Sequence, residues 1–187
     1  MHKNHNLLLL SGMTFIILST SLNKTSTSRL IAKQCENEFK HLNKSVELID
    51  LNTISIPFCD AGSAYGNKTV QEISEKIRLA SGIILCSPVY NYDISAAAKN
   101  IIELTGKSWT KKVVGIAVAA GAYGSLLSPY QITTSLMMDF RCVIVPKQVY
   151  VTGDAITNNA ITNNDVIERI TELTKTVVYF SEQLKDY

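Results

Sequence analysis

Runs of consecutive apolar residues alternate along this chain with segments in which apolar residues recur every three or four positions. The apolar runs predict buried β-strands, and they span residues 14–20, 46–51, 82–88, 113–121 and 142–151. The periodic segments predict amphipathic α-helices, and they span residues 28–42, 69–80, 95–104, 128–138 and 165–184. The pattern therefore indicates a regular alternation of strand and helix.

Strands that are apolar throughout are typical of a parallel sheet covered on both faces. Alternation with helices through right-handed crossovers predicts a doubly wound α/β fold, with five parallel strands and helices on both faces. We expect one domain over residues 13–187, preceded by an N-terminal extension, residues 1–12. Ligands of such sheets bind beyond the carboxyl ends of the strands. The loops after the first, third and fourth strands are therefore the candidate site.

The apolar segment at residues 7–18 has a second interpretation. It follows Lys3 and resembles the hydrophobic region of a signal peptide, and it is too short to span a bilayer as a helix. We favour a first strand that opens at Met13, because removal of a signal peptide would delete the element that presents the first candidate loop.

Local signals refine the element boundaries. Pro88 is expected to end the third strand, and Pro146 interrupts the fifth. Ser128 and Pro129 suit the N-cap and first turn of the fourth helix. The sequence AITNN occurs twice in succession, over residues 155–164, and is interpreted as a polar loop.

Composition narrows the functional classes. The net charge is only +2 and the basic residues are scattered, which argues against a nucleic-acid partner. The four cysteines lie far apart, with no Cys or His at metal-binding spacing, so we expect no metal site. Their spacing favours reduced, mostly buried thiols in a cytoplasmic protein.

The first candidate loop, Ser19–Arg29, is rich in hydroxyl and amide side chains and contains no carboxylate. A helix N-terminus attracts phosphate, because its free backbone N–H groups and its dipole favour an anion. Further donors come from side chains of this loop: Ser21, Asn23, Ser26 and Ser28. Lys24 or Arg29 can add positive charge. The alternative is that the hydroxyls only cap the helix, but the length of the run favours an anion site.

The second and third candidate loops carry aromatic and small residues. In SPVYNYD, residues 87–93, two tyrosines and an asparagine suit a flat aromatic ligand. Aromatic packing at a subunit contact is a compatible alternative. In AAGAYGS, residues 119–125, small residues let the backbone approach a planar ligand, with Tyr123 as a candidate lid. An ordinary glycine turn would have the same sequence.

Two common phosphate-binding motifs are missing. Gly121 and Gly124 lack the remaining glycine of a GxGxxG motif. Residues 106–108 match the end of a Walker A loop, but they precede a strand, and Ile101 stands where that motif needs glycine. We interpret this segment as a helix C-cap and turn, which argues against nucleoside triphosphate hydrolysis.

Two of the loops match longer patterns. Residues 18–32, LSTSLNKTSTSRLIA, align without gaps with the pattern GSLRxxSxNR. Residues 87–104, SPVYNYDISAAAKNIIEL, match (S/T)PEYN followed by KN, and residues 119–125 match a third, glycine-containing loop loosely. On these motifs the chain, from about residue 13 through the last helix, resembles the NAD(P)H-dependent FMN reductase family. This flavodoxin-like group includes quinone, chromate and azo-dye reductases.

The resemblance implies FMN as cofactor, with NADPH or NADH as the hydride donor. It implies that the first loop holds the FMN phosphate, through Ser19, Ser21, Asn23, Ser26, Thr27 and Ser28. It implies that the isoalloxazine ring lies along the second loop, at Pro88, Val89, Tyr90, Asn91 and Tyr92. The third loop would close the other side with Gly121, Ala122 and Tyr123.

The chain departs from the family pattern in both specific motifs. Asn23 replaces arginine, Ser28 replaces asparagine, Thr20 replaces glycine and Val89 replaces glutamate. Loss of the arginine removes a charge-assisted contact with the phosphate, worth about 1.5–3 kcal/mol unless Lys24 substitutes for it.

The resemblance implies an oxidoreductase that takes hydride from NAD(P)H and passes electrons to flavin, quinone or another oxidised acceptor. The flavin carries that chemistry, so no catalytic residue is expected, and no Ser–His–Asp or paired-carboxylate pattern is present. One alternative is a flavodoxin-type electron carrier, disfavoured by a pI of about 8.3 because such carriers are acidic. Another is a flavin-free protein that binds partners.

The resemblance also implies a homodimer or homotetramer, with the SPVYN segment and its helix at the contact. The alanines of residues 96–98 agree, because small side chains allow close approach. The expected partner is otherwise a small-molecule electron acceptor, with no nucleic acid and no membrane span.

Overall fold

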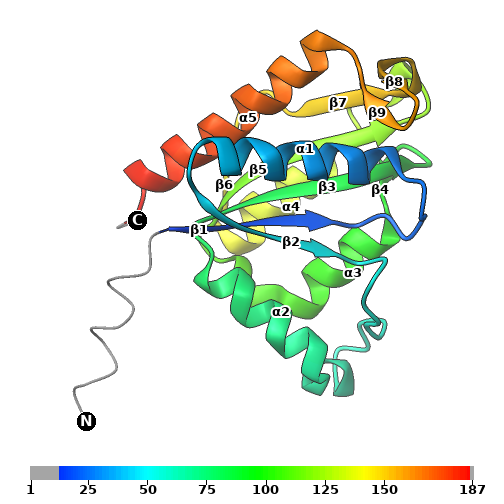
Figure 1. The fold of residues 1–187 in the computed structure, drawn as a ribbon. Coiled ribbons are helices and arrows are strands. Elements are labelled where there is room, and N and C mark those ends of the chain that lie inside the picture. The colour runs from blue at the N-terminus through cyan, green and yellow to red at the C-terminus, as the bar shows by residue number, and fades with distance from the viewer. Residues whose placement is uncertain (1–12, 186–187) are drawn as a thin grey trace.

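A computed structural model of this chain describes residues 13–185, and its centre is a mostly parallel sheet (Figure 1). The strands are β1 Thr14–Ser19, β2 Ser45–Asp50, β3 Gly82–Tyr90, β4 Asp93–Ile94, β5 Val113–Ala120, β6 Val143–Ile144 and β7 Val149–Thr152. They follow the order β2-β1-β3-β5-β6, and β7 pairs with β5 further along the same edge. Because β6 and β7 share the position of one strand interrupted around Pro146, the predicted five-stranded parallel order is confirmed.

Helices cover both faces of this sheet, as predicted (Figure 1). They are α1 Thr27–His41, α2 Lys68–Leu79, α3 Ala96–Thr105, α4 Tyr130–Phe140 and α5 Asn164–Gln183. Helices α1 and α5 pack with the sheet in one apolar core, and α2, α3 and α4 pack in the other. The sheet is therefore the middle layer of three.

The first strand shows why the apolar runs are continuous. Phe15 and Ile17 belong to the core on the α1 side, and Ile16 and Leu18 belong to the core on the opposite side. All four are almost wholly buried. Since successive side chains of a strand point to opposite faces, a strand covered on both sides buries consecutive residues and therefore favours apolar ones.

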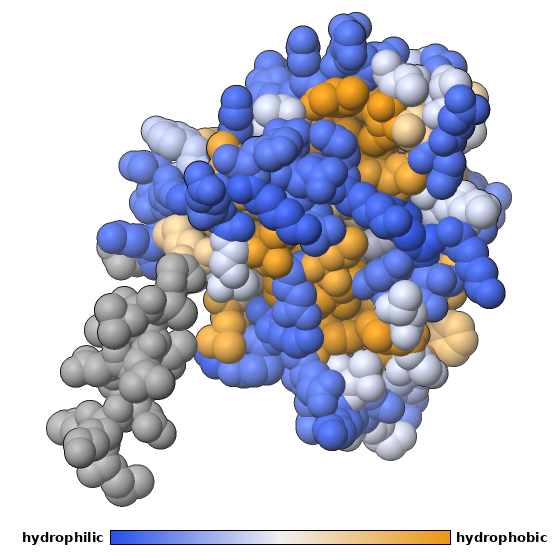
Figure 2. Space-filling view, viewed as in Figure 1, coloured by the Kyte–Doolittle hydropathy of each residue, from blue (hydrophilic) through white to orange (hydrophobic). Residues whose placement is uncertain are grey.

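Helix α1 has the opposite character, with one apolar face. Its buried residues include Ile31, Cys35 and Phe39, which lie at helical spacing. Figure 2, viewed as in Figure 1, shows hydrophilic residues over the outward surface of α1 and hydrophobic residues between it and the neighbouring elements. The predicted amphipathic pattern is confirmed.

Two strand glycines let α5 lie close to the sheet. A Cβ at Gly115 would lie 2.8 Å from Val177 and 3.1 Å from Leu173, and a Cβ at Gly82 would lie 3.0 Å from Val177. Contacts this short require the helix to move away, so glycine at these two positions is required by packing.

The third strand does not end at Pro88, so that prediction is wrong. Strand β3 continues to Tyr90, and Pro88 stays in register with Ala119 of β5. The other neighbour, β1, already ends opposite Cys86. With a parallel partner on one side only, the strand tolerates a residue without an N–H. The chain then reverses through Asn91 and Tyr92, both at positive φ, into the short antiparallel strand β4.

Two other local predictions are also wrong. Ser128 does not cap α4: the helix starts at Tyr130 with Pro129 as N-cap, and the Ser128 Oγ is buried without a hydrogen-bond partner. The reason is that Ser128 and Tyr130 donate their N–H groups three residues back, in turns that precede the helix. The AITNN repeat, predicted to be a polar loop, contains a short antiparallel hairpin of β8 (Ile156–Thr157) and β9 (Ala160–Ile161).

The predicted N-terminal extension, residues 1–12, lies outside the described residues, and β1 begins directly after Met13. Within residues 13–185, no helix is long and apolar enough to cross a membrane.

Candidate functional site

The three candidate loops meet at the carboxyl ends of β1, β3 and β5 and enclose a cavity of about 310 Å³, here called the loop cavity. Its lining residues are Ser21, Asn23, Thr25, Ser26, Thr27, Ser28, Pro88, Val89, Tyr90, Ala119, Ala120, Gly121 and Gly153. Nine of these were singled out from the sequence. The topology thus brings together residues about 100 positions apart, at the edge where doubly wound sheets bind ligands.

The other five predicted site residues lie elsewhere. Ser19 is wholly buried within β1, and its Oγ has no hydrogen-bond partner. Asn91 lines a neighbouring cavity of about 640 Å³ between the β3–β4 turn, α3 and α4, and Tyr90 borders both cavities. Tyr92, Ala122 and Tyr123 line neither of these cavities.

The third loop is held by Tyr150. The Tyr150 hydroxyl donates a 2.6 Å hydrogen bond to the Ala122 carbonyl, and its ring stacks on Tyr123 with centroids 6.2 Å apart. Burial raises the pKa of Tyr150, so the hydroxyl stays protonated and remains a donor at neutral pH. The exposed ring of Tyr123 is therefore anchored beside the loop cavity.

Helix α1 presents an uncapped N-terminus to the loop cavity. Ser26 is its N-cap, but the Ser26 hydroxyl pairs with the Ser28 hydroxyl at 2.8 Å and makes no capping hydrogen bond. The backbone N–H groups of Ser26, Thr27 and Ser28 have no acceptor among the described residues. The first turn contains no acidic residue. These donors and the helix dipole face the cavity without a compensating anion.

The N-caps of α2, α3 and α5 show the usual arrangement. Asn67, Ser95 and Asn163 each accept a hydrogen bond from the backbone N–H three residues later. Capping of this kind contributes about 1 kcal/mol. The idea that the first-loop hydroxyls merely cap α1 is therefore not supported, and the free donors fit an anion such as a phosphate group.

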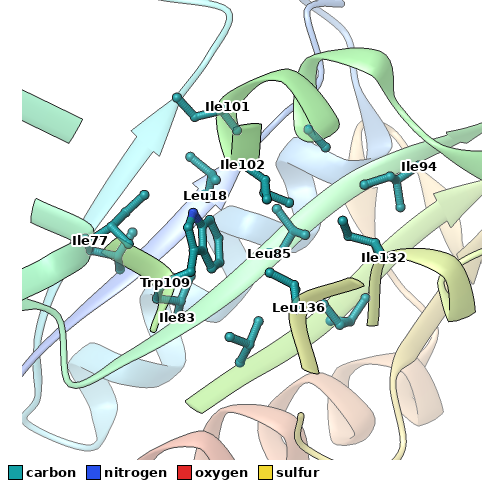
Figure 3. Close-up of a cluster of buried hydrophobic side chains, with 14 of the residues drawn as sticks. Leu18, Ile77, Ile83, Leu85, Ile94, Ile101, Ile102, Trp109, Ile132 and Leu136 are labelled. Atoms are coloured by element: carbon teal, nitrogen blue, oxygen red, sulfur yellow. The ribbon is translucent and has the colours of Figure 1, made fainter. Parts of the chain in front are cut away.

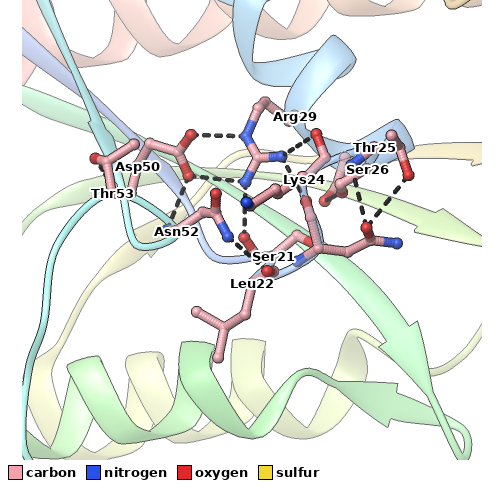
Figure 4. A network of polar contacts seen from close by, with 11 residues as sticks. Ser21, Leu22, Lys24, Thr25, Ser26, Arg29, Asp50, Asn52 and Thr53 are labelled. Carbon is pink, nitrogen blue, oxygen red and sulfur yellow. Dashed lines mark hydrogen bonds and ion pairs between the residues drawn. The ribbon is translucent and has the colours of Figure 1, made fainter.

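Arg29 is not available to that anion, which corrects the expectation that it adds charge there. Its Nε and Nη2 donate to Asp50 at 2.6 and 3.1 Å, and its remaining N–H groups donate to backbone carbonyls of the first loop (Figure 4). Lys24 is exposed, and its ammonium group makes no hydrogen bond or ion pair with any described residue. Of the two cations, only Lys24 is free to approach the loop cavity.

Small residues form the opposite wall. Gly121 and Gly153 line the loop cavity, and a Cβ added at either would meet no atom within 4 Å. Neither glycine has a positive φ, so the fold itself does not require glycine at these positions. Open space beside glycine and alanine fits close approach of a planar ligand.

The sequence alone did not indicate Gly153, Thr25, Ala119 or Ala120 as lining residues. Gly153 directly follows β7, at the carboxyl end of the interrupted fifth strand. The rule that pointed to the loops after the first, third and fourth strands would have found it if applied to every strand. Among residues 13–185, no group of three or more His, Cys, Asp or Glu side chains is arranged to hold a metal ion.

A doubly wound α/β sheet, with an uncapped helix N-terminus facing a cavity at the carboxyl ends of its strands, defines a flavodoxin-like fold with a candidate anion site. The model of the NADPH-dependent FMN reductase family matches residues 13–155, and the chain belongs to that family. It is therefore an oxidoreductase, and the family indicates FMN and NAD(P)H as its cofactors.

Named relatives agree with this placement. The chain is 27% identical to an NAD(P)H-dependent FAD/FMN reductase of Geobacillus thermodenitrificans, over 75% of this chain and 77% of the relative. It is 26% identical to an NADPH azoreductase of a Bacillus species, over 75% and 78% of the two chains.

Solved structures share the fold. A flavoenzyme NAD(P)H:(acceptor) oxidoreductase of Paracoccus denitrificans superposes with a TM-score of 0.75 at 17% identity, over 92% of this chain and 98% of that one. A flavodoxin from the domain Archaea gives a TM-score of 0.64 at 11% identity, over 91% and 99%.

Proposed function

We propose that this chain binds FMN in the loop cavity and uses it to transfer electrons from NADPH or NADH to a flavin, quinone or other oxidised small molecule. The observation that carries the proposal is the uncapped N-terminus of α1, which faces a cavity closed by glycine and alanine in a member of an FMN reductase family. The first loop supplies donors for a phosphate, and the small-residue wall leaves room for a planar ring.

The residues of the loop cavity bind and orient in this proposal. The hydroxyl of Ser21, one hydroxyl of the Ser26–Ser28 pair and the free N–H groups of α1 donate hydrogen bonds to the phosphate. The backbone of Pro88 and Val89 forms one wall for the ring, and Gly121 forms part of the other. The exposed rings of Tyr90, Tyr92 and Tyr123, with Asn91 and Ala122, form the rim and exclude water from the reacting face.

When bound, FMN would supply the redox chemistry, with a hydride taken from the nicotinamide and its two electrons passed on to the second substrate. The protein then needs no general base, and the site residues act by position and by hydrogen bonding. Asn23 stands where the family pattern has arginine. Its side chain accepts hydrogen bonds from the backbone N–H and the hydroxyl of Thr25 and so stabilises the conformation of the loop. Lys24 is left as the cation that can approach the phosphate.

The visible absorption spectrum of the purified protein tests the proposal. We expect added FMN to give a flavin band that shifts on binding and bleaches when NADPH or NADH is added without oxygen. Bleaching followed by fast turnover with quinone supports the reductase. Bound flavin without NAD(P)H oxidation would instead favour the electron carrier. A protein that stays colourless and does not bind FMN would exclude the proposal.

Replacing Gly121 with leucine is expected to weaken FMN binding about tenfold, with little change in the free energy of unfolding. The leucine side chain points into open space and therefore clashes with a ligand and not with the protein. A fluorescence titration of FMN and a urea denaturation curve measure the two effects. Gly66→Leu is the control, because Gly66 also has open space around it but lies outside the loop cavity. Equal FMN affinities for both variants would contradict the placement of the ring.

We also propose that the chain forms a homodimer or homotetramer in the cytoplasm. Exposed apolar side chains gather at the rim and along α4, including Tyr92, Leu127, Tyr130, Met137 and Met138. Exposed apolar patches of this kind mark interaction surfaces. Light scattering after size-exclusion chromatography measures the mass directly, and a monomer at micromolar concentration would contradict the proposal.

A further inference from the structure

Every N–H donor of Arg29 is used in a hydrogen bond within the protein. Two donate to the carboxylate of Asp50, and the other three donate to the backbone carbonyls of Ser21, Asn23 and Lys24. A guanidinium has five N–H donors and no more. Arg29 therefore has no donor left for a ligand, and its side chain is only 11% exposed.

Asn52 completes the arrangement, which Figure 4 shows from close by. The Asn52 amide donates to the carbonyl of Leu22, the residue of the loop that Arg29 does not reach. All four consecutive carbonyls of residues 21–24 are thus bound by side chains from α1 and from the end of β2. Asp50 orients both donors, because it also accepts the backbone N–H of Asn52 at 3.1 Å.

The side chains that bind the loop carbonyls are not among those that line the loop cavity. Arg29, Asp50 and Asn52 do not line the loop cavity, whereas Ser21, Asn23 and residues 25–28 do. A carbonyl oxygen carries partial negative charge and repels a phosphate, whereas backbone N–H groups and hydroxyls attract it. A loop of polar residues can turn either its carbonyl oxygens or its N–H and hydroxyl groups toward a ligand. Contacts elsewhere in the protein must therefore fix which of these groups face the cavity.

We propose that Arg29 and Asp50 are positioning residues for phosphate recognition. Arg29, oriented by Asp50, draws the loop carbonyls away from the cavity and so leaves N–H and hydroxyl donors facing the flavin phosphate. The charge of Arg29 is balanced by Asp50, so the pair acts through geometry and adds no net attraction for an anion. This inference rests on the proposed function, and it explains how a chain without the family's arginine at position 23 can still present an anion site.

The test compares FMN with riboflavin, which has the same ring and no phosphate. The ratio of the two dissociation constants isolates the phosphate contribution to affinity. The variants are Arg29→Lys, which keeps the charge but not the planar fork, and Asp50→Asn, which keeps the size but not the ion pair. Arg78→Lys is the matched control, because Arg78 also donates through Nε and Nη2 to a carboxylate, that of Glu75, on the exposed surface of α2.

We expect both Arg29→Lys and Asp50→Asn to lower the FMN preference over riboflavin about tenfold, with riboflavin affinity unchanged within twofold. Arg78→Lys should leave both constants unchanged. Amide hydrogen exchange in the flavin-free protein gives a second readout that needs no ligand. Residues 22–26 should exchange about tenfold faster in the Arg29 variant than in wild type, with the rest of the chain unaffected.

The inference is overturned if the FMN preference is unchanged in both variants, or if FMN and riboflavin affinities fall in parallel. A parallel fall would mean that Arg29 supports the fold as a whole. Both results leave the proposed function standing, because wild type still binds flavin. A wild-type chain that binds neither flavin overturns the proposed function and this inference together.

Discussion

Replacing Ser26 with aspartate is expected to weaken FMN binding at least about 100-fold while the flavin-free protein becomes no less stable. Ser26 is the N-cap of α1 and lines the loop cavity. Its backbone is extended, at φ −90° and ψ 130°, which suits a capping side chain. An aspartate there can accept the free N–H groups of the first turn, which stabilises the helix by about 1 kcal/mol.

The introduced carboxylate accepts hydrogen bonds from the N–H groups that would otherwise bind the phosphate. It also places a negative charge beside the phosphate. Two unit charges 4 Å apart repel by about 4 kcal/mol at the effective dielectric constant of a protein surface. A loss of about 3 kcal/mol corresponds to roughly 100-fold in the dissociation constant. Isothermal titration with FMN measures the loss, and thermal unfolding of the flavin-free protein measures the stability.

Ser26→Asn is the matched control, because asparagine has the shape of aspartate and also caps helices, but it carries no charge. It should lose much less FMN affinity than Ser26→Asp, and riboflavin affinity should be similar in both. If the two variants lost FMN affinity equally, the charge at position 26 would not be close to the phosphate. A gain in helix stability at the expense of ligand binding would explain why Ser26 leaves the first turn of α1 without a capping hydrogen bond.

Replacing Trp109 with alanine is expected to lower the free energy of unfolding by about 3–5 kcal/mol without changing FMN affinity. Trp109 is wholly buried in the core beneath α2, α3 and α4, among Leu18, Ile83 and Ile102 (Figure 3). Its Nε1 donates a 2.8 Å hydrogen bond to the Thr105 hydroxyl. Truncation leaves a large apolar cavity that the surrounding sheet and helices can only partly fill.

The FMN affinity should be unchanged because Trp109 precedes β5 and so lies at the end of the sheet opposite the loop cavity. Urea unfolding followed by circular dichroism measures the loss, since the chain has no other tryptophan for fluorescence. Trp109→Phe should cost less, and Phe58→Ala, which removes an aromatic ring that is 82% exposed, should change stability by less than about 0.5 kcal/mol. A change below about 1 kcal/mol for Trp109→Ala would contradict the packing role.

Prediction from sequence succeeded where a local pattern of apolar residues is typical of one kind of secondary structure. The continuous apolar run at β1 is typical of a strand buried on both faces, and the observed burial of Phe15 through Leu18 agrees. The parallel order then followed from alternation with helices, and with it the edge at which the loops meet. This is why nine residues chosen from three separate loops line one cavity.

Prediction failed where a residue's role depends on backbone contacts that its own short motif does not record. Pro88 looked like the end of a strand, but β5 continues beside it and keeps it in register. Ser128 looked like an N-cap, but the turns before α4 moved the helix start to Tyr130. In both cases the local preference was real, but a distant strand overrode it at Pro88 and the turns that precede α4 overrode it at Ser128.

The sequence by itself determined the fold class, the family and the set of loops that form the candidate site, because periodicity and short motifs are local properties of the chain. Only the tertiary structure decided what the polar residues of the first loop do. It turned all the donors of Arg29 toward Asp50 and the loop carbonyls, and it left the first turn of α1 uncapped. The direction of a hydrogen bond depends on where β2 lies relative to α1, and no pattern along the chain records that geometry.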